Sequence, residues 1–558
     1  MSLVDRRLGL LFACFLLLFT IALVRAAWLQ AVQGGDLRAD AQSQQTEVVT
    51  IPGVRGTIYD RTGTHQLALS EDAVSVFATP YQVENAPRTA SKLAAALGED
   101  ESDILEVIAN DESGFEYVAR KVDLPTADEI EKLELPGIGL LPDSRRVYPE
   151  GELASQVIGT VGIDNQGLTG LEAAEDDVLG GDDGERIVTR DALGEELERS
   201  TTDPSAAGAD LRLTIDASIQ ATTERVIQEI GETSQPRAAT AIVMDPQTSE
   251  ILAMANWPSV DPYNLNEAEP EDLTNMATSF TYEPGSTFKA FTVGASLEEG
   301  VITPKTTFDL PPVLQVADRT IEESHPRGYA TMSVADILAQ SSNVGAVKIG
   351  LQLNEERGND TFDGWIRKFG FGTPTGIDFP GEEQGIVLTP EEYSGSSMGN
   401  LPLGQGLSVT PIQIANGYAA IANGGILRTP KLVISENGEP VESAEGARVM
   451  SKQNASRLRE MLEGVLEAGG TASAVEVPGY VLAGKTGTAQ KVVDGEYSES
   501  EYVGSFVGFA PAEDPRLLVT VVVDSPTIGS YYGGDVAAPA FGEIANFALP
   551  YLGVPRDR

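Results

Sequence analysis

Ser286 and Lys289 are the two residues whose types and spacing could carry out nucleophilic catalysis. They stand in the run Ser286-Thr287-Phe288-Lys289, directly after Glu283-Pro284-Gly285. Because Pro-Gly interrupts the incoming chain and FKAFTVGASLEEG follows, we predict a helix that begins near Ser286 and ends at Gly300. The backbone N–H of a serine at a helix start has no helical partner and can face a developing oxyanion. A lysine three residues later lies on the same face. Taken alone, this pattern is also typical of a capped surface helix.

The chemistry requires Lys289 to be neutral. A serine hydroxyl is a weak nucleophile unless a base takes its proton. An ordinary lysine pKa of about 10.4 leaves less than about a thousandth of the amine neutral at pH 7. Lowering that pKa by ~3 units corresponds to about 4 kcal/mol, and burial and a nearby second cation are the usual causes. We therefore expect Lys289 to face another lysine.

A second motif, Ser341-Ser342-Asn343, lies between TMSVADILAQ and VGAVKIGLQL. Both flanks have helical patterns, so we predict a short connection between two helices. A hydroxyl there can relay a proton, and the Asn343 carboxamide can hold a substrate amide. By itself the motif is also consistent with an ordinary helix cap.

A third motif, Lys485-Thr486-Gly487-Thr488, follows apolar residues that predict a strand. Lys485 supplies the second positive charge, and the hydroxyls of Thr486 and Thr488 can hold a carboxylate. Gly487 leaves room for a substrate backbone to approach, although a strand bent at glycine would also explain it. The order S-x-x-K, S-x-N, K-T-G matches the S-x-x-K, S-D-N, K-T-G signature shared by class A β-lactamases and penicillin-binding proteins.

Composition excludes several other kinds of site. The net charge of −46 argues against nucleic acid as a partner, and a solvated acidic surface is its simplest explanation. The single cysteine, Cys14, excludes an intrachain disulfide and a thiolate zinc site. Two histidines, His65 and His325, are too few for a multi-histidine metal site, and we expect each on the surface or in packing. We expect no metal and no cofactor.

An apolar segment near the N-terminus predicts one membrane helix. Residues 8–24 carry no charge, and residues 26–29 extend the apolar helix toward an interfacial tryptophan, Trp28. Arg6 and Arg7 should keep the N-terminus in the cytoplasm. A cleaved signal peptide is the alternative, but Arg25 and Trp28 stand where a cleavage site needs small residues. Everything after residue 30 is then expected outside the cytoplasm.

The elements expected along the chain suggest an α/β sheet flanked by helices, with the two ends of the second domain pairing. With 558 residues, we expect two or three domains. We predict a helical run before the strand and turn within 34–63, helices within 90–135, and an acidic linker at 173–205. Beyond Leu211 we predict a helix at 216–230, a hairpin of ATAIVMDP and EILAMANWP, and helices over 286–350 and 410–423. Three strands should follow in YVLAGKTGTAQK, EYVGSFVGFAP and RLLVTVVVDSP, with a final helix at 536–550.

The chain resembles the class B penicillin-binding proteins well beyond these motifs. RGTIYDRTG at 55–63 and RRVYPEGELASQVIGTVG at 145–162 look like that family's pedestal motifs, and MGNLPLGQGLSVTPIQIANGYAAIANGG at 398–425 looks like its stretch between the second and third motifs. The resemblance implies the penicillin-binding transpeptidase fold (α/β, or α+β), with a mainly antiparallel sheet flanked by helices. It also implies an elongated mixed α/β pedestal and one N-terminal transmembrane helix. The expected domains are a cytoplasmic tail (1–7), an anchor (8–29), a dimerisation-like pedestal (30–207) and a transpeptidase domain (208–558).

The resemblance also implies a role for each motif residue. Ser286 would be acylated by a stem peptide ending in D-Ala-D-Ala, with Lys289 taking the serine proton and Ser341 passing one to the departing D-Ala. Lys485 would keep the region electropositive, and Asn343 would orient the peptide amide. The terminal carboxylate would bind Thr486 and Thr488, and the N–H groups of Ser286 and Thr488 would form the oxyanion hole. Gly487 completes the substrate-binding strand. Ser342 departs from the S-D-N form at a position that varies within the family.

The expected function is a monofunctional, plasma-membrane D,D-transpeptidase, more similar to the division (septal) type than to the elongation type. Its expected partners are peptidoglycan stem peptides, β-lactams as covalent inhibitors, a membrane glycosyltransferase and divisome proteins. A membrane-anchored serine β-lactamase and a D,D-carboxypeptidase share the motifs and remain alternatives. A non-catalytic scaffold of a cell-wall assembly complex is a further alternative.

Overall fold

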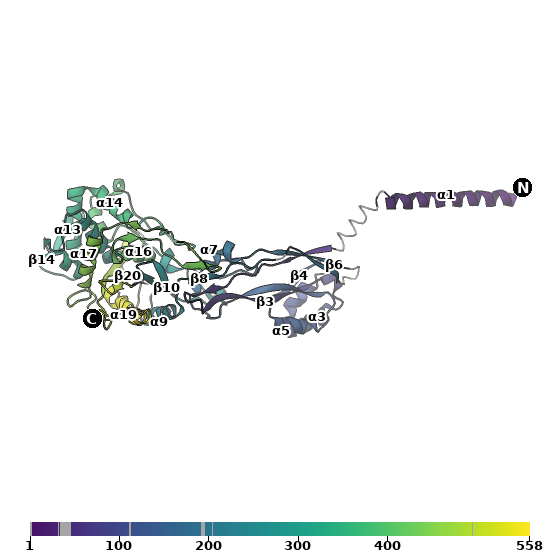
Figure 1. Ribbon diagram of the computed structural model, residues 1–558, viewed down its shortest axis with the longest axis horizontal. Helices are drawn as coiled ribbons and strands as arrows, with labels where there is room; N and C mark the ends of the chain where they lie inside the picture. The colour runs from purple at the N-terminus through teal and green to yellow at the C-terminus, as the bar shows by residue number, and fades with distance from the viewer. Residues whose placement is uncertain are drawn as a thin grey trace. The chain divides into compact units, whose positions relative to one another are not determined.

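The computed structural model describes residues 3–31, 33, 46–110, 113–190, 196–203, 205–442, 444–493 and 495–557. The chain divides into two compact units, each built from several segments (Figure 1). The first contains Met1–Val54, Asp72–Ser144 and Gly181–Gly208, and the second contains Arg55–Glu71, Arg145–Gly180 and Ala209–Arg558. The segments that hold RGTIYDRTG and RRVYPEGELASQVIGTVG therefore belong to the second unit, although both precede residue 208.

The first unit begins with the apolar helix α1 (Leu3–Ala31). Within the described residues it is the one helix long and apolar enough to cross a membrane, and its large apolar side chains are exposed. The predicted helical run at 34–45 lies outside the described residues.

Helices and strands outside α1 give the first unit its own small core. An antiparallel sheet has the order β1-β6-β7, and a cluster centred on Val76, Leu93, Ile104 and Ile130 joins the helices to β3. The bounds are β1 (Thr46–Ile51), the end of β3 (Gln66–Ala78), α3 (Ala86–Leu97), α4 (Glu101–Ile108), β4 (Glu116–Val122), α5 (Leu124–Glu131), the start of β5 (Ile138–Val147), β6 (Gly184–Arg190) and β7 (Glu196–Asp203).

Two sequence predictions are wrong in this unit. The predicted linker at 173–205 contains the strands β6 and β7 in its described part, and successive residues of the two strands pair in antiparallel register. The predicted helices within 90–135 are interrupted by β4, which pairs with the end of β3. The acidic run at 98–103 contains the start of α4, where the Asp100 side chain accepts from the N–H of Ser102.

The second unit is organised around a five-stranded antiparallel sheet with the order β10-β9-β21-β20-β19. The predicted hairpin is β9 (Ala238–Asp245) with β10 (Glu250–Trp257), and the predicted C-terminal strands are β19 (Ala483–Val493), β20 (Glu496–Ala510) and β21 (Leu517–Asp524). The expected pairing of the two ends is confirmed, because Leu518 of β21 lies opposite Met244 of β9.

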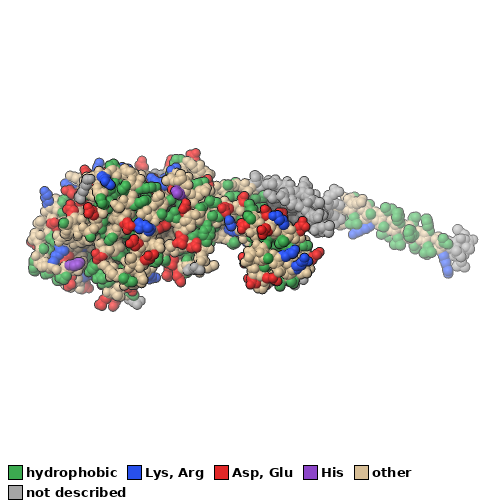
Figure 2. Space-filling model, turned by 90° about the horizontal axis from the view of Figure 1, so that it is seen from below, with side chains coloured by type: hydrophobic (Ala, Val, Ile, Leu, Met, Phe, Trp, Pro, Cys, Tyr) green, Lys and Arg blue, Asp and Glu red, His purple; other side chains and the backbone are tan. Residues whose placement is uncertain are grey.

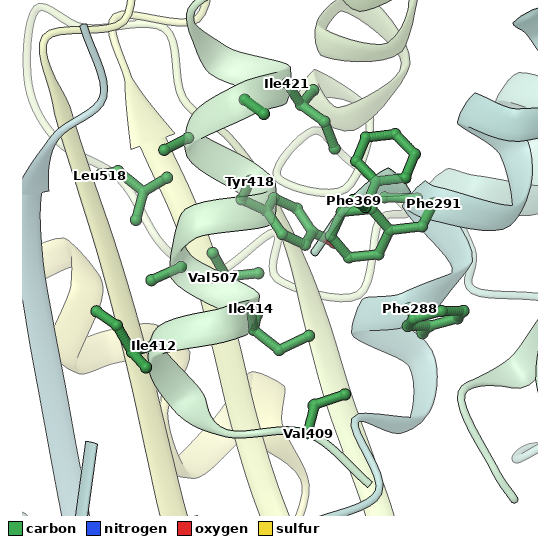
Figure 3. Packing of buried hydrophobic residues seen from close by; sticks show 14 of the residues in the cluster. Phe288, Phe291, Phe369, Val409, Ile412, Ile414, Tyr418, Ile421, Val507 and Leu518 are labelled. Atoms are coloured by element: carbon green, nitrogen blue, oxygen red, sulfur yellow. The ribbon is translucent and has the colours of Figure 1, made fainter. Parts of the chain in front are cut away.

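Side-chain alternation along these strands creates two cores, one on each face of the sheet. In β9, Ile242 and Met244 join one cluster of buried side chains, whereas Ala241 and Val243 join another. The second cluster packs under α9 (Ala217–Ser234) and α19 (Ala538–Tyr551). The first packs under α11 (Lys289–Glu298) and α16 (Pro411–Ala422), and Figure 3 shows Tyr418 of α16 beside the phenyl rings of this core.

Helices and two short two-stranded sheets cover the α11 side of the sheet. The region predicted to be helical over 286–350 contains these two sheets, β11 with β14 and the hairpin of β12 with β13, so the prediction is wrong between residues 307 and 333. The bounds are η2 (Leu265–Glu267), α10 (Met276–Ser279), η3 (Gly285–Phe288), β11 (Thr307–Leu310), β12 (Val313–Val316), β13 (Arg319–Glu322), β14 (Ala330–Ser333), α12 (Val334–Ala339), α13 (Asn343–Arg357), α14 (Asn359–Lys368), η4 (Pro390–Glu392), α15 (Ser397–Asn400), η5 (Leu401–Leu403), α17 (Lys452–Glu463) and α18 (Gly533–Val536).

The segments around 55–63 and 145–162 are joined by buried ion pairs. The Glu172 carboxylate, fully buried, accepts hydrogen bonds from the guanidinium groups of Arg55 and Arg146. This cluster stands beside a smaller sheet of order β17-β16-β8-β2, continued by the start of β3. The bounds are β2 (Ile58–Tyr59), α6 (Ser155–Ile158), α7 (Gly170–Ala174), α8 (Asp176–Leu179), β8 (Leu211–Leu213), β16 (Val433–Glu436), β17 (Glu439–Pro440) and, in a separate pair, β15 (Ile426–Leu427) and β18 (Ala447–Arg448).

Candidate active site

Ser286 lies in the first helical turn, as predicted. That turn is the 3₁₀ helix η3, which passes directly into α11 at Lys289. Gly285 takes φ +53°, a conformation that favours glycine, and its N–H donates to the Gly404 carbonyl at 3.0 Å. The fully buried Tyr418 hydroxyl donates to the Thr287 carbonyl at 2.6 Å. These contacts fix the backbone on both sides of the partly exposed Ser286.

The Lys289 amine is buried and is hydrogen-bonded to the second motif. Its Nζ donates to the Ser341 carbonyl at 2.7 Å, to Ser341 Oγ at 3.2 Å and to Asn343 Oδ1 at 2.7 Å. A buried polar group is tolerated when it is hydrogen-bonded, and these acceptors offset much of the cost of removing the amine from water. The first two motifs are therefore brought together, as the sequence predicted.

The second motif forms the predicted connection between α12 and α13. Ser341 takes φ +55°, which is uncommon for a residue with a Cβ and turns its carbonyl toward Lys289. Ser342 is fully buried and caps α13 by accepting from the Gly345 N–H at 3.0 Å. Asn343 is the first residue of α13, and its Nδ2 donates to the Glu322 carbonyl at 2.8 Å. Both ends of the Asn343 carboxamide are thus engaged within the protein.

The third motif lies on β19, again as predicted, and Gly487 permits the close approach of this strand to η3. A Cβ at Gly487 would lie 2.3 Å from Ser505 Oγ, 2.9 Å from Thr287 Cγ2 and 3.1 Å from the Pro284 carbonyl oxygen. The first two distances are shorter than a Cβ contact allows and the third is tight, so a side chain at residue 487 would force the side chains of Ser505 and Thr287 to shift.

The threonines on either side of Gly487 have defined partners. The hydroxyl of Thr486 lies 2.8 Å from that of Thr471, and Thr488 Oγ1 accepts from the Gly533 N–H at 3.1 Å. Lys485 is fully buried, and its Nζ donates to the Thr486 carbonyl at 3.1 Å.

Burial dominates the electrostatics of the two lysines. It lowers the pKa of Lys289 to about 7, while the charge of Glu323 raises that pKa and the charge of Arg327 lowers it. Burial also lowers the pKa of Lys485 well below its ordinary value, and the positive charge of Lys289 lowers it further. The positive charge of Lys289 thus acts on Lys485, whereas burial is the larger cause of both shifts and Arg327 is the cation that lowers the pKa of Lys289.

A cleft of about 280 Å³ opens over Ser286. Motif residues Ser341, Thr486 and Thr488 line it, whereas Lys289 and Lys485 are buried behind its wall. Further lining residues carry no motif in the sequence: Glu323, Ser324, His325, Arg327, Gln340, Thr471, Tyr532, Gly534 and Asp535. His325 was expected on the surface or in packing, and it stands at this cleft with its ring 5.7 Å from that of Tyr532.

The arrangement has the parts needed for acyl transfer through serine. It combines a partly exposed hydroxyl at a helix start with a buried amine whose pKa is near neutrality and a hydroxyl that contacts that amine. Within the described ranges, no group of three or more His, Cys, Asp or Glu side chains is placed to hold a metal ion.

Comparison with known proteins agrees with this geometry. Residues 239–546 match the family model described as "Penicillin binding protein transpeptidase domain", and residues 50–213 match "Penicillin-binding Protein dimerisation domain". The chain is 36% identical to stage V sporulation protein D of Bacillus subtilis, covering 99% of this chain and 86% of that protein. It is 34% identical to peptidoglycan D,D-transpeptidase FtsI of Escherichia coli K12, and the match covers 99% of this chain and 93% of that protein. The structure is also similar to a crystal structure of penicillin-binding protein 3 from Mycobacterium tuberculosis, complexed with aztreonam. The TM-score is 0.71 at 28% sequence identity, and the match covers 91% of this chain and 98% of that chain.

Proposed function

The chain belongs to the class B penicillin-binding proteins, and we propose that this D,D-transpeptidase cross-links peptidoglycan stem peptides through an acyl-enzyme on Ser286, in septal wall synthesis. The observation that carries the proposal is the convergence of three distant motifs. The Lys289 amine contacts Ser341 and Asn343, and the cleft over Ser286 is lined by Thr486 and Thr488.

In the first half-reaction, Ser286 Oγ attacks the carbonyl carbon of the penultimate D-Ala. Its proton passes to the neutral amine of Lys289. The tetrahedral intermediate then breaks its C–N bond, and the departing D-Ala nitrogen takes a proton that Ser341 relays from Lys289. The products are a serine ester and free D-Ala, and Lys289 is neutral again.

In the second half-reaction, an amine of a neighbouring stem peptide attacks the serine ester. The acceptor amine loses a proton to the neutral Lys289 as the new amide bond forms, and Lys289 returns this proton to Ser286 Oγ as the ester C–O bond breaks. The N–H groups of Ser286 and Thr488 donate to the oxyanion in both half-reactions. The electropositive site around Lys485, with the hydroxyls of Thr486 and Thr488, holds the terminal carboxylate of the donor. Gly487 keeps the strand edge open to the peptide, and Asn343 orients its amide.

The cellular setting is the second part of the proposal. The helix α1 supports a single-pass membrane protein, and Arg6 and Arg7 support a cytoplasmic N-terminus with the catalytic unit outside. We retain the division into a tail (1–7), anchor (8–29), pedestal (30–207) and transpeptidase domain (208–558). Similarity to FtsI over 99% of the chain favours the septal role, with a membrane glycosyltransferase and divisome proteins as partners. Related proteins crystallised with aztreonam and ampicillin support covalent inhibition by β-lactams.

Labelling with a fluorescent penicillin tests the catalytic proposal. The intact protein should gain one penicillin mass, and the adduct should map to the peptide that contains Ser286. Ser286→Ala should abolish labelling, whereas Ser324→Ala, at another serine that lines the same cleft, should retain it. An adduct on a different residue would refute the assignment.

Three further measurements separate the alternatives. Loss of the adduct within seconds would indicate a β-lactamase, because a transpeptidase hydrolyses it slowly. With a pentapeptide donor and an amine acceptor, cross-linked product distinguishes the transpeptidase from a carboxypeptidase. Cells that rely on Ser286→Ala should fail to divide, and normal division would support the scaffold.

A further inference from the structure

Glu323 contacts the second motif through both oxygens of its carboxylate. Oε1 accepts from the Ser342 hydroxyl, and Oε2 accepts from the Asn343 backbone N–H at 2.7 Å. The preceding residue, Glu322, contributes its carbonyl to Asn343 Nδ2. The end of β13 and the residue after it therefore hold both the backbone and the side chain of Asn343.

These contacts lead directly to the proposed base. Asn343 Oδ1 accepts from Lys289 Nζ at 2.7 Å, so Glu323 reaches the amine through one intervening residue. Ser342, which stands where the S-D-N form has aspartate, donates to Glu323 while its oxygen caps α13. An acidic group thus still supports this motif, but it comes from a separate loop.

The charge of Glu323 also affects the pKa of Lys289. The charged groups around that amine are Lys485 from β19 and Glu323 and Arg327 from the loop after β13, and His325 and Asp535 line the same cleft. The carboxylate of Glu323 raises the pKa of Lys289, opposing burial and Arg327. Its negative charge therefore limits how far the amine pKa falls.

We propose that Glu323 is a positioning residue for acylation: its carboxylate clamps the Ser341–Asn343 connection and, through Asn343, holds the Lys289 amine in place with a counter-charge nearby. This role rests on the proposed function of Ser286 and Lys289. Glu323 has two separable effects, because the clamp depends on the reach of the side chain and the counter-charge depends on ionisation.

Three substitutions at residue 323 separate these effects, and a fourth serves as a control. Glu323→Gln keeps the length and can still accept from Asn343 N–H while donating to Ser342, but it has no charge. Glu323→Asp keeps the charge and shortens the reach, and Glu323→Ala removes both. Glu322→Gln changes the neighbouring exposed carboxylate, whose backbone alone contacts Asn343. The measurement is the rate constant of penicillin acylation from pH 5.5 to 9, on the full chain, with thermal melting recorded for each variant.

The acid limb is the part of the pH profile in which the acylation rate constant rises with pH as Lys289 loses its proton. Glu323→Gln should shift this limb to lower pH by roughly one unit, because removal of a nearby negative charge lowers the amine pKa further. Glu323→Asp should keep the limb near its wild-type pH with an acylation rate constant about tenfold lower, and initial penicillin binding should change less than that rate. Glu322→Gln should match the wild type.

A Glu323→Gln protein that melts normally and keeps the wild-type acid limb would refute the proposed role of the Glu323 charge. Wild-type acylation rate constants in Glu323→Asp, and in Glu323→Ala where it folds, would refute the proposed role of the Glu323 contacts to Ser342 and Asn343. If Glu323→Ala does not fold, the Gln and Asp variants still decide both points. A wild-type protein that never labels at Ser286 would instead refute the proposed function, so the two failures are distinguishable.

Discussion

The pH dependence of Ser286 acylation follows from the burial of Lys289. With a pKa of about 7, the amine is about one-tenth neutral at pH 6, about half neutral at pH 7 and about nine-tenths neutral at pH 8. If the neutral amine is the base, the acylation rate constant should rise about tenfold between pH 6 and pH 8 and then level off. An unperturbed lysine would be neutral in only about four molecules in ten thousand at pH 7, and the rate would rise about a hundredfold over the same interval.

Stopped-flow acylation with a fluorescent penicillin measures this curve. The pH should be changed in overlapping buffers at constant ionic strength, and circular dichroism should show that the protein stays folded throughout. A rate that continues to rise tenfold per pH unit above pH 8 would refute the reasoning, because the base would then have an ordinary lysine pKa. A flat rate between pH 6 and pH 8 would contradict a Lys289 base with a pKa near 7.

Three substitutions test the packing that supports the site. Gly487→Ala should destabilise the protein by about 1–3 kcal/mol and slow acylation at least tenfold, since its Cβ would lie 2.3 Å from Ser505 Oγ; melting and labelling rates measure both effects. Glu172→Gln should lower the free energy of unfolding by about 3–5 kcal/mol in urea titrations, because two buried guanidinium groups lose their shared charged partner. Tyr418→Phe should cost about 1 kcal/mol and slow acylation severalfold, because the Thr287 carbonyl loses its donor.

Matched controls show whether these effects are specific. Gly364→Ala, at a helical glycine with open space around its Cβ position, should be neutral or slightly stabilising. Glu71→Gln removes an exposed pair with Arg145 and should change stability by less than about 1 kcal/mol. Tyr480→Phe removes a comparable hydroxyl contact away from the cleft and should leave acylation unchanged. Equal effects in a test variant and its control would contradict the corresponding prediction.

The elements that carry the motifs could be predicted because their signals are local. Pro284-Gly285 marks the start of the Ser286 helix, and the apolar run before Lys485 marks an edge strand of the sheet. Helical flanks on both sides of Ser341 locate the connection between α12 and α13. The burial of Lys289 could be inferred from chemistry, since a lysine that acts as a base must lose its charge near neutral pH.

The rest depends on contacts between segments that are distant in sequence. The strands β4, β6 and β7 have mixed polar sequences, and only their pairing partners make them strands. Glu323 and Tyr532 carry no local sign of their place at the cleft, because folding of β13 and α18 brings them there. The position of Gly487 was predicted as room for substrate, but its immediate constraint is the close approach of Ser505 and the Ser286 turn.

The acidic charge of the whole chain does not prevent binding of an anionic peptide at this cleft. Figure 2 shows Asp and Glu side chains spread over the visible face of the second unit with Lys and Arg among them, and such exposed charges are screened beyond about 8 Å at physiological salt. In the proposed mechanism, the donor carboxylate binds the hydroxyls of Thr486 and Thr488 at the cleft, and the amines of Lys289 and Lys485 are buried behind them. A bound carboxylate raises the pKa of Lys485, and a charged Lys485 in turn favours a neutral Lys289. Substrate binding should thus favour the neutral form of Lys289, which acylation needs.

The pH dependence of acylation tests this coupling. The acid limb of the acylation rate at saturating penicillin should lie at lower pH than the limb at low penicillin, and a shift to higher pH would contradict the coupling.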